Sequence, residues 1–399
     1  MIRPGNRLTL LENGVQYFPA LIAAMDAARH EIHLESYIYT ADATGREVSA
    51  ALMRAARRGV VTRVLLDGFG SRDLSAELVG ELRGAGVELL FYRPERGFMR
   101  LRRHRLRRMH RKLAVVDARI GFVGGINIVD DQDGRNLAAP REDFAIEVSG
   151  PLVADIHGAA RQLWKLVEWS RMGLRRGEDT WLKPDTRAVG EQHAELLTRD
   201  SLHRRRAIER AYLKAIGHAR EEVLIANAYF LPGRRFRQAL LEATRRGVRV
   251  ILVMQGHTDH RLYHAASRAL YRFFLENGME VYEYHASELH AKAAVVDGHW
   301  ATLGSSNIDP FSLLLAREAN LATHDPTFAR HLRERILHSR DRGAHRIHRQ
   351  AWREIPWTLR FASWLAYGVV RGLMGLAGYA QAYDGGKRRA RGEHGRRVM

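Results

Sequence analysis

The sequence predicts an α/β protein built from two similar halves, and three observations favour this fold. One short pattern occurs twice, as HRKLAVVDARIGFVGGIN at 110–127 and as HAKAAVVDGHWATLGSSN at 290–307. The segments before each copy show helical and strand-like hydrophobic periods in the same order. Their strand-like runs are almost continuously apolar, which is typical of parallel or mixed sheets covered by helices.

The elements of the first half follow one another in a βαβαβ order. Residues 19–39 carry an amphipathic helical pattern that leads into a short strand-like run. A second helical pattern covers 46–60, and the apolar strand VTRVLLDG follows at 61–68. After another helix, the glycine-led run GVELLFY at 86–92 has the composition of a strand.

The second half repeats this order. Residues 207–230 match the first helix and strand, and 235–248 match the second helix. The strands RVILVMQG at 249–256 and GMEVYEY at 278–284 complete the series. The repeating unit therefore has the size of a domain and not of a short solenoid repeat.

A polar stretch with loop signals, RMGLRRGEDTWLKPDTR, marks the boundary region between the halves at 171–200. We predict a first half at 1–195, a second half at 196–345, and a terminal segment at 346–399. Trp164 and Trp169 are expected in the core of the first half.

The two copies of the motif share their polar and glycine positions, which are His110 and His290, Lys112 and Lys292, Asp117 and Asp297, Gly124 and Gly304, and Asn127 and Asn307. Residues two apart on a strand face the same side, so each histidine should point the same way as its lysine. The apolar runs that follow would bury the strands, with the aspartates at the next turn. The glycines end the following strand, where they let backbone approach a ligand closely.

This residue set suits the chemistry of phosphate esters. A neutral imidazole can attack phosphorus, and a second imidazolium can protonate the leaving alkoxide. Lysines and asparagines can stabilise charge on the non-bridging oxygens, and Ser305 and the glycine-rich backbone add donors. These steps require no metal and no cofactor, so the sequence predicts neither. A single His-x-Lys would usually be a solvated strand face, but two copies in register argue against that reading.

Both motifs resemble the HxKxxxxD motif of the phospholipase D superfamily, over about residues 10–340. Within it, the chain is most similar to bacterial cardiolipin synthases of the short type, which lack paired N-terminal transmembrane helices. The supporting stretches are HLESYIYTAD at 33–42, DFAIEVSGPLV at 143–153 and LGSSNIDPFSLLLAREANL at 303–321. The resemblance implies two α/β halves with pseudo-twofold symmetry, one active site at their interface, and a covalent phosphatidyl-histidine intermediate.

The resemblance also implies roles for individual residues. His110 matches the usual nucleophile, and His290 matches the general acid that later acts as base, although the near symmetry of the motifs leaves this assignment open. With them, Lys112, Asp117, Lys292 and Asp297 complete the expected catalytic set, in which the aspartates are structural or orienting groups.

An acidic residue in the AREAN stretch of the second half, Glu318, is implied to bind an active-site histidine and fix its tautomer. Asp143 is its expected first-half counterpart, although its spacing from the motif differs. The first motif carries Gly125 where the second has a serine, which removes one hydroxyl donor from the first half. That departure is not expected to abolish activity.

A net charge of +19 and a pI near 10.6 indicate a polyanionic partner, either nucleic acid or an anionic membrane. With no cysteine, the chain has neither disulfides nor a thiolate metal site, and its N-terminus lacks the apolar region of a secretory signal.

Seven arginines precede or enter the first motif, namely Arg100, Arg102, Arg103, Arg105, Arg107, Arg108 and Arg111. They could hold lipid head groups or dock the protein on a membrane. Nucleic acid is disfavoured because no aromatic residues are interleaved among them.

The terminal segment gives a second indication of a membrane. Residues 356–380 are apolar and rich in Trp and Tyr, but Arg371 interrupts them, which disfavours a spanning helix. We expect an interfacial or shallowly inserted helix followed by a basic tail at 387–397. A core-packing helix with a disordered tail is the alternative.

The resulting hypothesis is a phosphatidyltransferase on the cytoplasmic face of the cytoplasmic membrane, peripheral or monotopic. It would transfer a phosphatidyl group from phosphatidylglycerol to a hydroxyl of a second phospholipid and release glycerol. Hydrolytic phospholipase D activity is the alternative, followed by a nucleic-acid phosphodiesterase. A non-catalytic binding protein would be favoured only if a motif were degenerate. The sequence leaves open the acceptor alcohol, including phosphatidylethanolamine or a small polyol, and the oligomeric state.

Overall fold

The computed structural model describes residues 1–94, 107–131, 140–172, 181–200, 204–256, 261–310, 312, 315–354 and 356–376. The first-half strands are β1 (Arg3–Glu12), β2 (Glu31–Ser36), β3 (Val61–Asp67), β4 (Glu88–Tyr92), β5 (Lys112–Val116), β6 (Ile120–Gly124) and β7 (Phe144–Ser149). Its helices are α1 (Asn13–Ala27), α2 (Ala43–Arg57), α3 (Ala76–Gly84) and α4 (Val153–Met172).

The second half repeats this set and adds helices at its end. Its strands are β8 (Gln192–Arg199), β9 (Glu222–Asn227), β10 (Arg249–Gln255), β11 (Glu280–Tyr284), β12 (Lys292–Val296), β13 (Trp300–Gly304), β14 (Glu318–Thr323) and β15 (Ala344–Ile347). Its helices are α5 (Ala207–His218), α6 (Arg234–Arg245), α7 (Arg261–Arg268), α8 (Tyr271–Glu276), α10 (Pro326–Gly343), α11 (Arg349–Glu354) and α12 (Trp357–Leu376).

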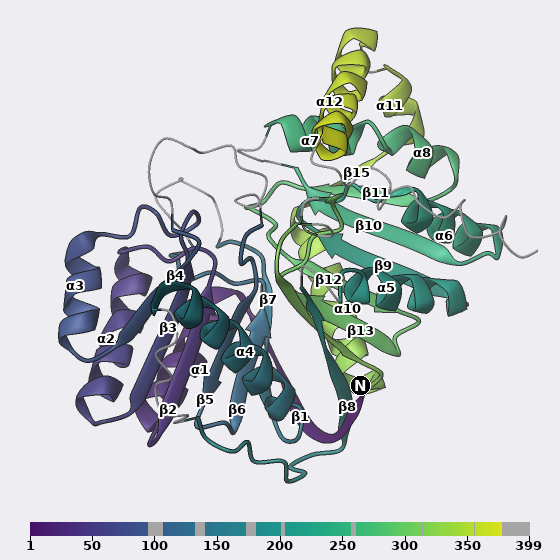
Figure 1. The fold of residues 1–399 in the computed structure, drawn as a ribbon. Helices are drawn as coiled ribbons and strands as arrows, with labels where there is room; N and C mark the ends of the chain where they lie inside the picture. Colours follow the sequence, from purple (N-terminus) through teal and green to yellow (C-terminus); the bar gives the residue numbers. More distant parts are fainter. Residues whose placement is uncertain are drawn as a thin grey trace, which may run out of the picture.

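Strand pairing in the described residues gives the two halves the same topology (Figure 1). From the central pair β1 and β8 outward, one side runs β7-β6-β5-β2-β3-β4 and the other runs β14-β13-β12-β9-β10-β11, with β15 at the edge. The outer three strands of each set are parallel, whereas the motif hairpins β5–β6 and β12–β13 are antiparallel. The prediction of two α/β halves with mixed strands is confirmed.

The expected elements of both halves are present, with ends shifted by a few residues. Local capping explains where α2 and α10 begin: Asp42 accepts a hydrogen bond from the Gly45 N–H, and Asp325 accepts one from the Phe328 N–H. The predicted boundary at 195/196 falls within β8, which pairs with β14 of the second half and also with β1 of the first.

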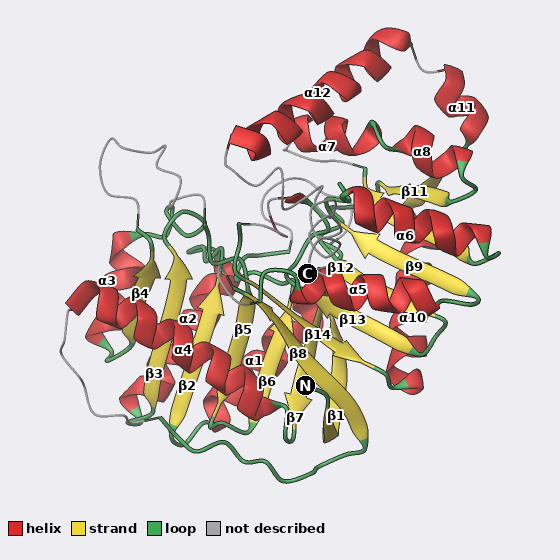
Figure 2. Ribbon diagram, turned by 45° about the vertical axis from the view of Figure 1, so that its right-hand side comes forward, coloured by secondary structure: helices red, strands yellow, loops and turns green. Residues whose placement is uncertain are grey.

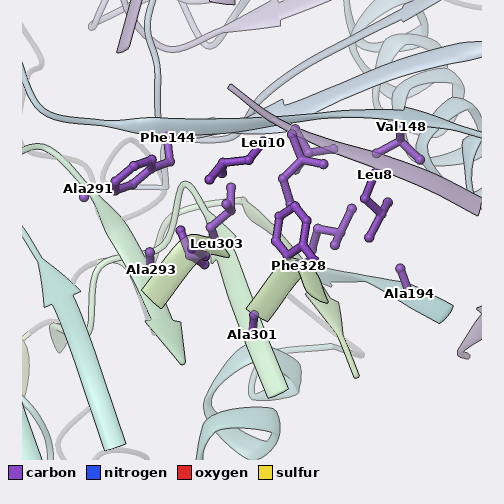
Figure 3. Close-up of a cluster of buried hydrophobic side chains, with 14 of the residues drawn as sticks. Leu8, Leu10, Phe144, Val148, Ala194, Ala291, Ala293, Ala301, Leu303 and Phe328 are labelled. Atoms are coloured by element: carbon purple, nitrogen blue, oxygen red, sulfur yellow. The ribbon is translucent and has the colours of Figure 1, made fainter. Parts of the chain in front are cut away.

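A buried apolar cluster joins the two halves. Phe144 and Val148 of β7, Leu303 of β13 and Phe328 of α10 all belong to this cluster (Figure 3). Because these side chains come from both halves, their burial holds one half against the other. Burying apolar surface stabilises the fold by roughly 25 cal/mol for each Å² removed from water. This common core brings the starts of β5 and β12 to the same region.

The expectation for two tryptophans of α4 is half confirmed. Trp164 is buried in the first half, whereas Trp169 is 62% exposed, so its predicted core position is wrong. Five residues along a helix correspond to a rotation of about 140°, which turns Trp169 away from the face that packs.

The terminal helix α12 lies along α7, outside the layers of the two halves (Figure 2). Its Ala366 and Val370 are buried, whereas Trp357, Phe361 and Trp364 are more than half exposed. Within the part of the chain that the structure describes, no helix is both long enough and apolar enough to cross a membrane.

Candidate active site

The two motif histidines stand just before β5 and β12, and each is tied by its backbone to the other half. The His110 N–H donates to the Arg317 carbonyl at 2.9 Å, and the His290 N–H donates to the Glu142 carbonyl at 2.8 Å. Lys112 and Lys292 open β5 and β12, so the histidines lie just ahead of the strands and not within them as predicted. In the first half, Lys112 Nζ lies 3.3 Å from His110 Nε2, as expected if the two side chains point the same way.

Each histidine ring is also paired with a carboxylate from the other half. His110 Nδ1 lies 3.1 Å from Glu318 Oε2, and His290 Nδ1 lies 2.6 Å from Asp143 Oδ2. A carboxylate bound at Nδ1 favours the tautomer that carries its proton there, which leaves Nε2 with its lone pair. The arrangement thus orients two imidazoles for nucleophilic or acid–base work at Nε2.

Asp143 and Glu318 occupy equivalent positions in the two halves. The Gly125 N–H donates to the Phe144 carbonyl, and the Ser305 N–H donates to the Ala319 carbonyl, both at 3.0 Å. Each carboxylate residue immediately precedes the acceptor of that bond. The spacing from the histidine differs because the first half has a longer connection between its hairpin and β7.

The Gly125/Ser305 difference has a steric reason as well as a chemical one. Ser305 Oγ donates a hydrogen bond to Glu318 Oε2 at 2.5 Å, which helps to hold that carboxylate in place. At the equivalent position, a Cβ on Gly125 would lie 2.3 Å from Asp143 Oδ1. A serine in the first half would therefore displace the Asp143 carboxylate, because the shorter Asp143 side chain occupies the space that the serine would take.

The two motif lysines are almost completely buried and lie close to the histidines. Lys112 Nζ is 3.3 Å from His110 Nε2, and each lysine donates to the backbone carbonyl of its own histidine. Burial lowers the pKa of Lys112 to about 7, assisted by the charge of Lys292. Burial also lowers the pKa of Lys292, to about 8. Two buried cations favour an anionic ligand between them.

The histidines and Asp143 are shifted toward their neutral forms. Burial lowers the pKa of His110, partly offset by Glu318, and burial together with both lysines lowers the pKa of His290 well below its usual range. Burial raises the pKa of Asp143 to about 6. An imidazole with a lowered pKa is available as a nucleophile at neutral pH.

Tyr37 also contributes to the site and was not identified from the sequence. Its ring centroid lies 4.8 Å from the His110 ring, and Lys112 Nζ lies 5.3 Å from the same centroid. The residue sits in the HLESYIYTAD stretch just after β2, but it is absent from the repeated motif. Its position next to the histidine depends on the pairing of β2 with β5.

The motif aspartates lie at the opposite ends of β5 and β12 from the histidines. Asp117 accepts hydrogen bonds from the N–H groups of residues 29–31, and Asp297 accepts them from those of residues 220–222. These contacts tie each motif strand to the start of the neighbouring strand, which fits the expected structural role.

Asn127 and the motif glycines mainly organise backbone. Asn127 Oδ1 accepts a hydrogen bond from the Ile38 N–H at 3.1 Å, while Asn307 is buried at the end of the second motif. A Cβ on Gly124 would lie 2.6 Å from the Ala145 Cα, and one on Gly304 would lie 2.3 Å from the Ala319 carbonyl oxygen. Close contact with the adjacent strand is sufficient to require glycine at both positions, so the expected approach to a ligand is not needed to explain them.

The basic run before the first motif lies largely outside the described residues. Of its arginines, Arg108 is buried over the Phe69 ring and lies 3.8 Å from Asp67, and Arg111 is buried in an ion pair with Glu35. Because both side chains are buried and paired within the protein, they are not the membrane contacts that the charge pattern suggested.

The fold and site together define a class of enzyme: two His-x-Lys strands, related by a pseudo-twofold arrangement, form one basic and mostly buried centre. Comparison with known proteins agrees with that class. The family model described as "Cardiolipin synthase, PLD-like domain" matches residues 21–164 and 212–339, one segment in each half.

Relatives and solved structures extend this finding. The chain is 42% identical to cardiolipin synthase B of Escherichia coli K12 over 84% of this chain and 80% of that protein. It is 40% identical to cardiolipin synthase B of Salmonella typhi over 96% and 92% of the two chains. The crystal structure of phosphatidylserine synthase from Haemophilus influenzae has the same fold, with a TM-score of 0.66, 14% identity, and 94% of each chain covered.

The chain therefore belongs to the cardiolipin synthase family of the phospholipase D superfamily. It is an enzyme of the phosphatidyltransferase type.

Proposed function

We propose that this enzyme transfers a phosphatidyl group from phosphatidylglycerol to a hydroxyl group of a second phospholipid, with release of glycerol. The observation that carries the proposal is the pair of imidazoles, each held at Nδ1 by a carboxylate of the other half. Two oriented imidazoles beside two buried lysines supply a nucleophile, a proton donor and a positively charged phosphate site.

In the first step, His110 Nε2 attacks phosphorus and the bond from phosphorus to the glycerol oxygen breaks. His290 gives its proton to the leaving oxygen, so glycerol departs neutral. Although burial and the lysines lower the pKa of His290, the negative phosphodiester offsets the lysine charges, and Asp143 stabilises the imidazolium.

In the second step, His290 removes the proton from the acceptor hydroxyl. The acceptor oxygen attacks phosphorus, the bond from phosphorus to His110 breaks, and both histidines return to their starting states. Lys112 and Lys292 hold the non-bridging oxygens throughout, and their positive charge is most valuable where water is excluded. Glu318 and Asp143 fix the tautomers in both steps.

The choice between an alcohol and water as acceptor is tested by the products. Purified protein is mixed with labelled phosphatidylglycerol in detergent or vesicles, and the lipids are separated by chromatography. We expect cardiolipin with an equal amount of glycerol. Phosphatidic acid alone would mean that water is the acceptor and the enzyme is a hydrolase. No product from any lipid would contradict the proposal and direct attention to nucleic-acid phosphodiesters.

We further propose that the segment 346–399 attaches the enzyme to the membrane surface, next to catalytic halves at 1–195 and 196–345. The support is the exposed stripe of α12, where Trp357, Phe361, Trp364, Leu365 and Val369 recur at helical spacing while Ala366 and Val370 pack inward. Aromatic residues favour the head-group region, and the net charge of +19 favours anionic lipid. The basic tail at 387–397 lies outside the described residues.

A further inference from the structure

A cavity of about 530 Å³ lies behind the active site, between α4, the end of β8 and the residues just before β5. Figure 1 shows α4 crossing the first-half strands towards β8. Ala159 and Gln162 of α4 line one side of the cavity, and Thr198 and Arg199 line the other. Its volume is in the range of sites that bind small ligands.

One thin wall separates this cavity from the catalytic histidine. The wall is a backbone pairing in which the Arg317 N–H donates to the Arg108 carbonyl at 2.7 Å and the His110 N–H donates to the Arg317 carbonyl at 2.9 Å. His110 and Glu318 pair on the active-site side. Their chain neighbours Arg111 and Arg317 line the cavity, because successive residues of extended chain point in opposite directions.

The cavity lining is strongly basic. It contains Arg3, Arg111, Arg199, Arg204 and Arg317, against the carboxylates of Asp155 and Asp200. Arg3 pairs with Asp155, and Arg111 pairs with Glu35 behind it. Two other arginines of the lining donate hydrogen bonds to neutral groups: Arg204 to Thr198 Oγ1 at 3.1 Å, and Arg317 to Tyr92 Oη at 3.3 Å.

The pseudo-twofold arrangement shows that the fold itself does not require three of these arginines. At the related place in the other half, Ala291 stands for Arg111, Glu142 for Arg317 and Asn13 for Arg199. There, Ser339 of α10 donates to Glu142, and Arg335 of α10 pairs with Glu12. The same backbone arrangement therefore carries carboxylates bound by α10 at one of the two related places and a basic cavity at the other.

We propose that this cavity is a second anion site, which binds the phosphate group of a lipid head group or of a free phosphate. Arginine is the side chain best suited to phosphate, since its planar guanidinium donates two parallel hydrogen bonds. The bound group would contact the wall and not the reacting atoms. This site is additional to the proposed transfer reaction and does not depend on it.

The absence of cysteine from the chain allows a direct test that does not use activity. The variant Gln162→Cys carries a single thiol in the cavity lining, and its alkylation by a maleimide is followed at rising inorganic phosphate and constant ionic strength. We expect phosphate to slow the alkylation in a saturable manner, whereas chloride does not. The matched control is Lys165→Cys, on the exposed surface of α4 outside the cavity lining, whose alkylation rate should not change.

Arginine variants then test whether the protection of the thiol by phosphate depends on the arginines of the cavity. In the Gln162→Cys background, Arg204→Ala should raise the phosphate concentration for half-protection about tenfold, the effect expected for one charge-assisted hydrogen bond. Arg317→Gln should act in the same direction and provides a second variant if the first fails to fold. Arg210→Ala, an exposed arginine of α5 outside the cavity, should leave protection unchanged.

Vesicles separate the two sources of phosphate. Protection by phosphatidylglycerol vesicles at concentrations where inorganic phosphate is ineffective would assign the site to lipid head groups. Protection by inorganic phosphate alone would assign it to a soluble phosphate. Unsaturable protection, equal protection by chloride, or no effect of either arginine variant would overturn the proposal. Because alkylation is read without turnover, that failure would leave the proposed transfer reaction intact.

Discussion

His110 and His290 each depend on a carboxylate that is distant in sequence, so the electrostatics of the site can be tested one side chain at a time. Glu318 belongs to the half opposite His110, and Asp143 to the half opposite His290. The lysines, in contrast, bond to the carbonyl of their own histidine, and their low pKa values come chiefly from burial.

Replacing either orienting carboxylate should slow transfer without preventing folding. We expect Glu318→Gln and Asp143→Asn each to lower kcat by about 10²–10⁴-fold, because the amide no longer selects the productive tautomer or stabilises the imidazolium. KM should change little. Steady-state kinetics on phosphatidylglycerol measure the effect, and Glu142→Gln, whose side chain bonds Ser339, is the control. Near-normal kcat in both variants would refute the orienting role.

The dependence of kcat/KM on pH should be bell-shaped. On the acid side, Asp143 with a pKa of about 6 takes up a proton as pH falls and loses the negative charge that stabilises the His290 imidazolium. On the alkaline side, Lys112 and Lys292, with pKa values of about 7 and 8, lose their charge as pH rises. Bound phosphate favours charged lysines, so the alkaline limb of kcat should lie at higher pH than that of kcat/KM. A flat profile between pH 6 and 9 would contradict these assignments.

Gly125 should be intolerant of a side chain although its counterpart is a serine. In Gly125→Ser the new Cβ would displace the Asp143 carboxylate from His290, and we expect a loss of kcat of at least about tenfold. The double variant Gly125→Ser Asp143→Glu reproduces the Ser305–Glu318 pair of the other half and should recover part of that loss. Comparing kcat of the single and double variants measures how strongly the side chains at positions 125 and 143 depend on each other. An unaffected single variant would contradict the steric explanation.

At the scale of elements, the motif hairpins are rigid supports that position the chemistry at one end. Asp117 and Asp297 bind three consecutive backbone N–H groups each and hold β5 and β12 to their neighbours. The histidines lie at the other ends of these strands, in the short segments before β5 and β12, where their backbone N–H groups bond to the other half.

Substitutions on the exposed face of α12 should separate membrane binding from catalysis. We expect the triple substitution Trp357→Ser, Phe361→Ser and Trp364→Ser to weaken sedimentation with phosphatidylglycerol vesicles, because exposed aromatic side chains would no longer enter the head-group region. Turnover of lipid in detergent micelles should be retained. Thr358→Ala, also exposed on α12, is the control. Unchanged sedimentation of the triple variant would argue against this surface.

At the scale of the whole molecule, one chain contains one complete site. The core between the halves and the crossed pairs His110–Glu318 and His290–Asp143 are formed within a single chain. Neither half alone would hold both an imidazole and the carboxylate that orients it.

Mixing two inactive variants should therefore not restore activity. We expect His110→Ala and His290→Ala each to abolish turnover, and an equimolar mixture to remain inactive, since every chain still lacks one histidine of its own site. The lipid-product assay measures this, with each variant's fold checked by thermal denaturation. Recovered activity in the mixture would mean that residues from two chains complete a site, as in an exchanged dimer.

The sequence by itself determined the two-half α/β fold, the paired motifs and the chemistry they suit, because hydrophobic period and repeated residue types are local signals. It also indicated Glu318 and Asp143, but not which histidine each would meet. Only the tertiary structure decided that both pairs cross between the halves, that Tyr37 lies against His110, and that Gly125 makes room for Asp143. Such contacts join residues up to 208 positions apart, and they depend on how the two halves pack around a common core, which no local pattern encodes.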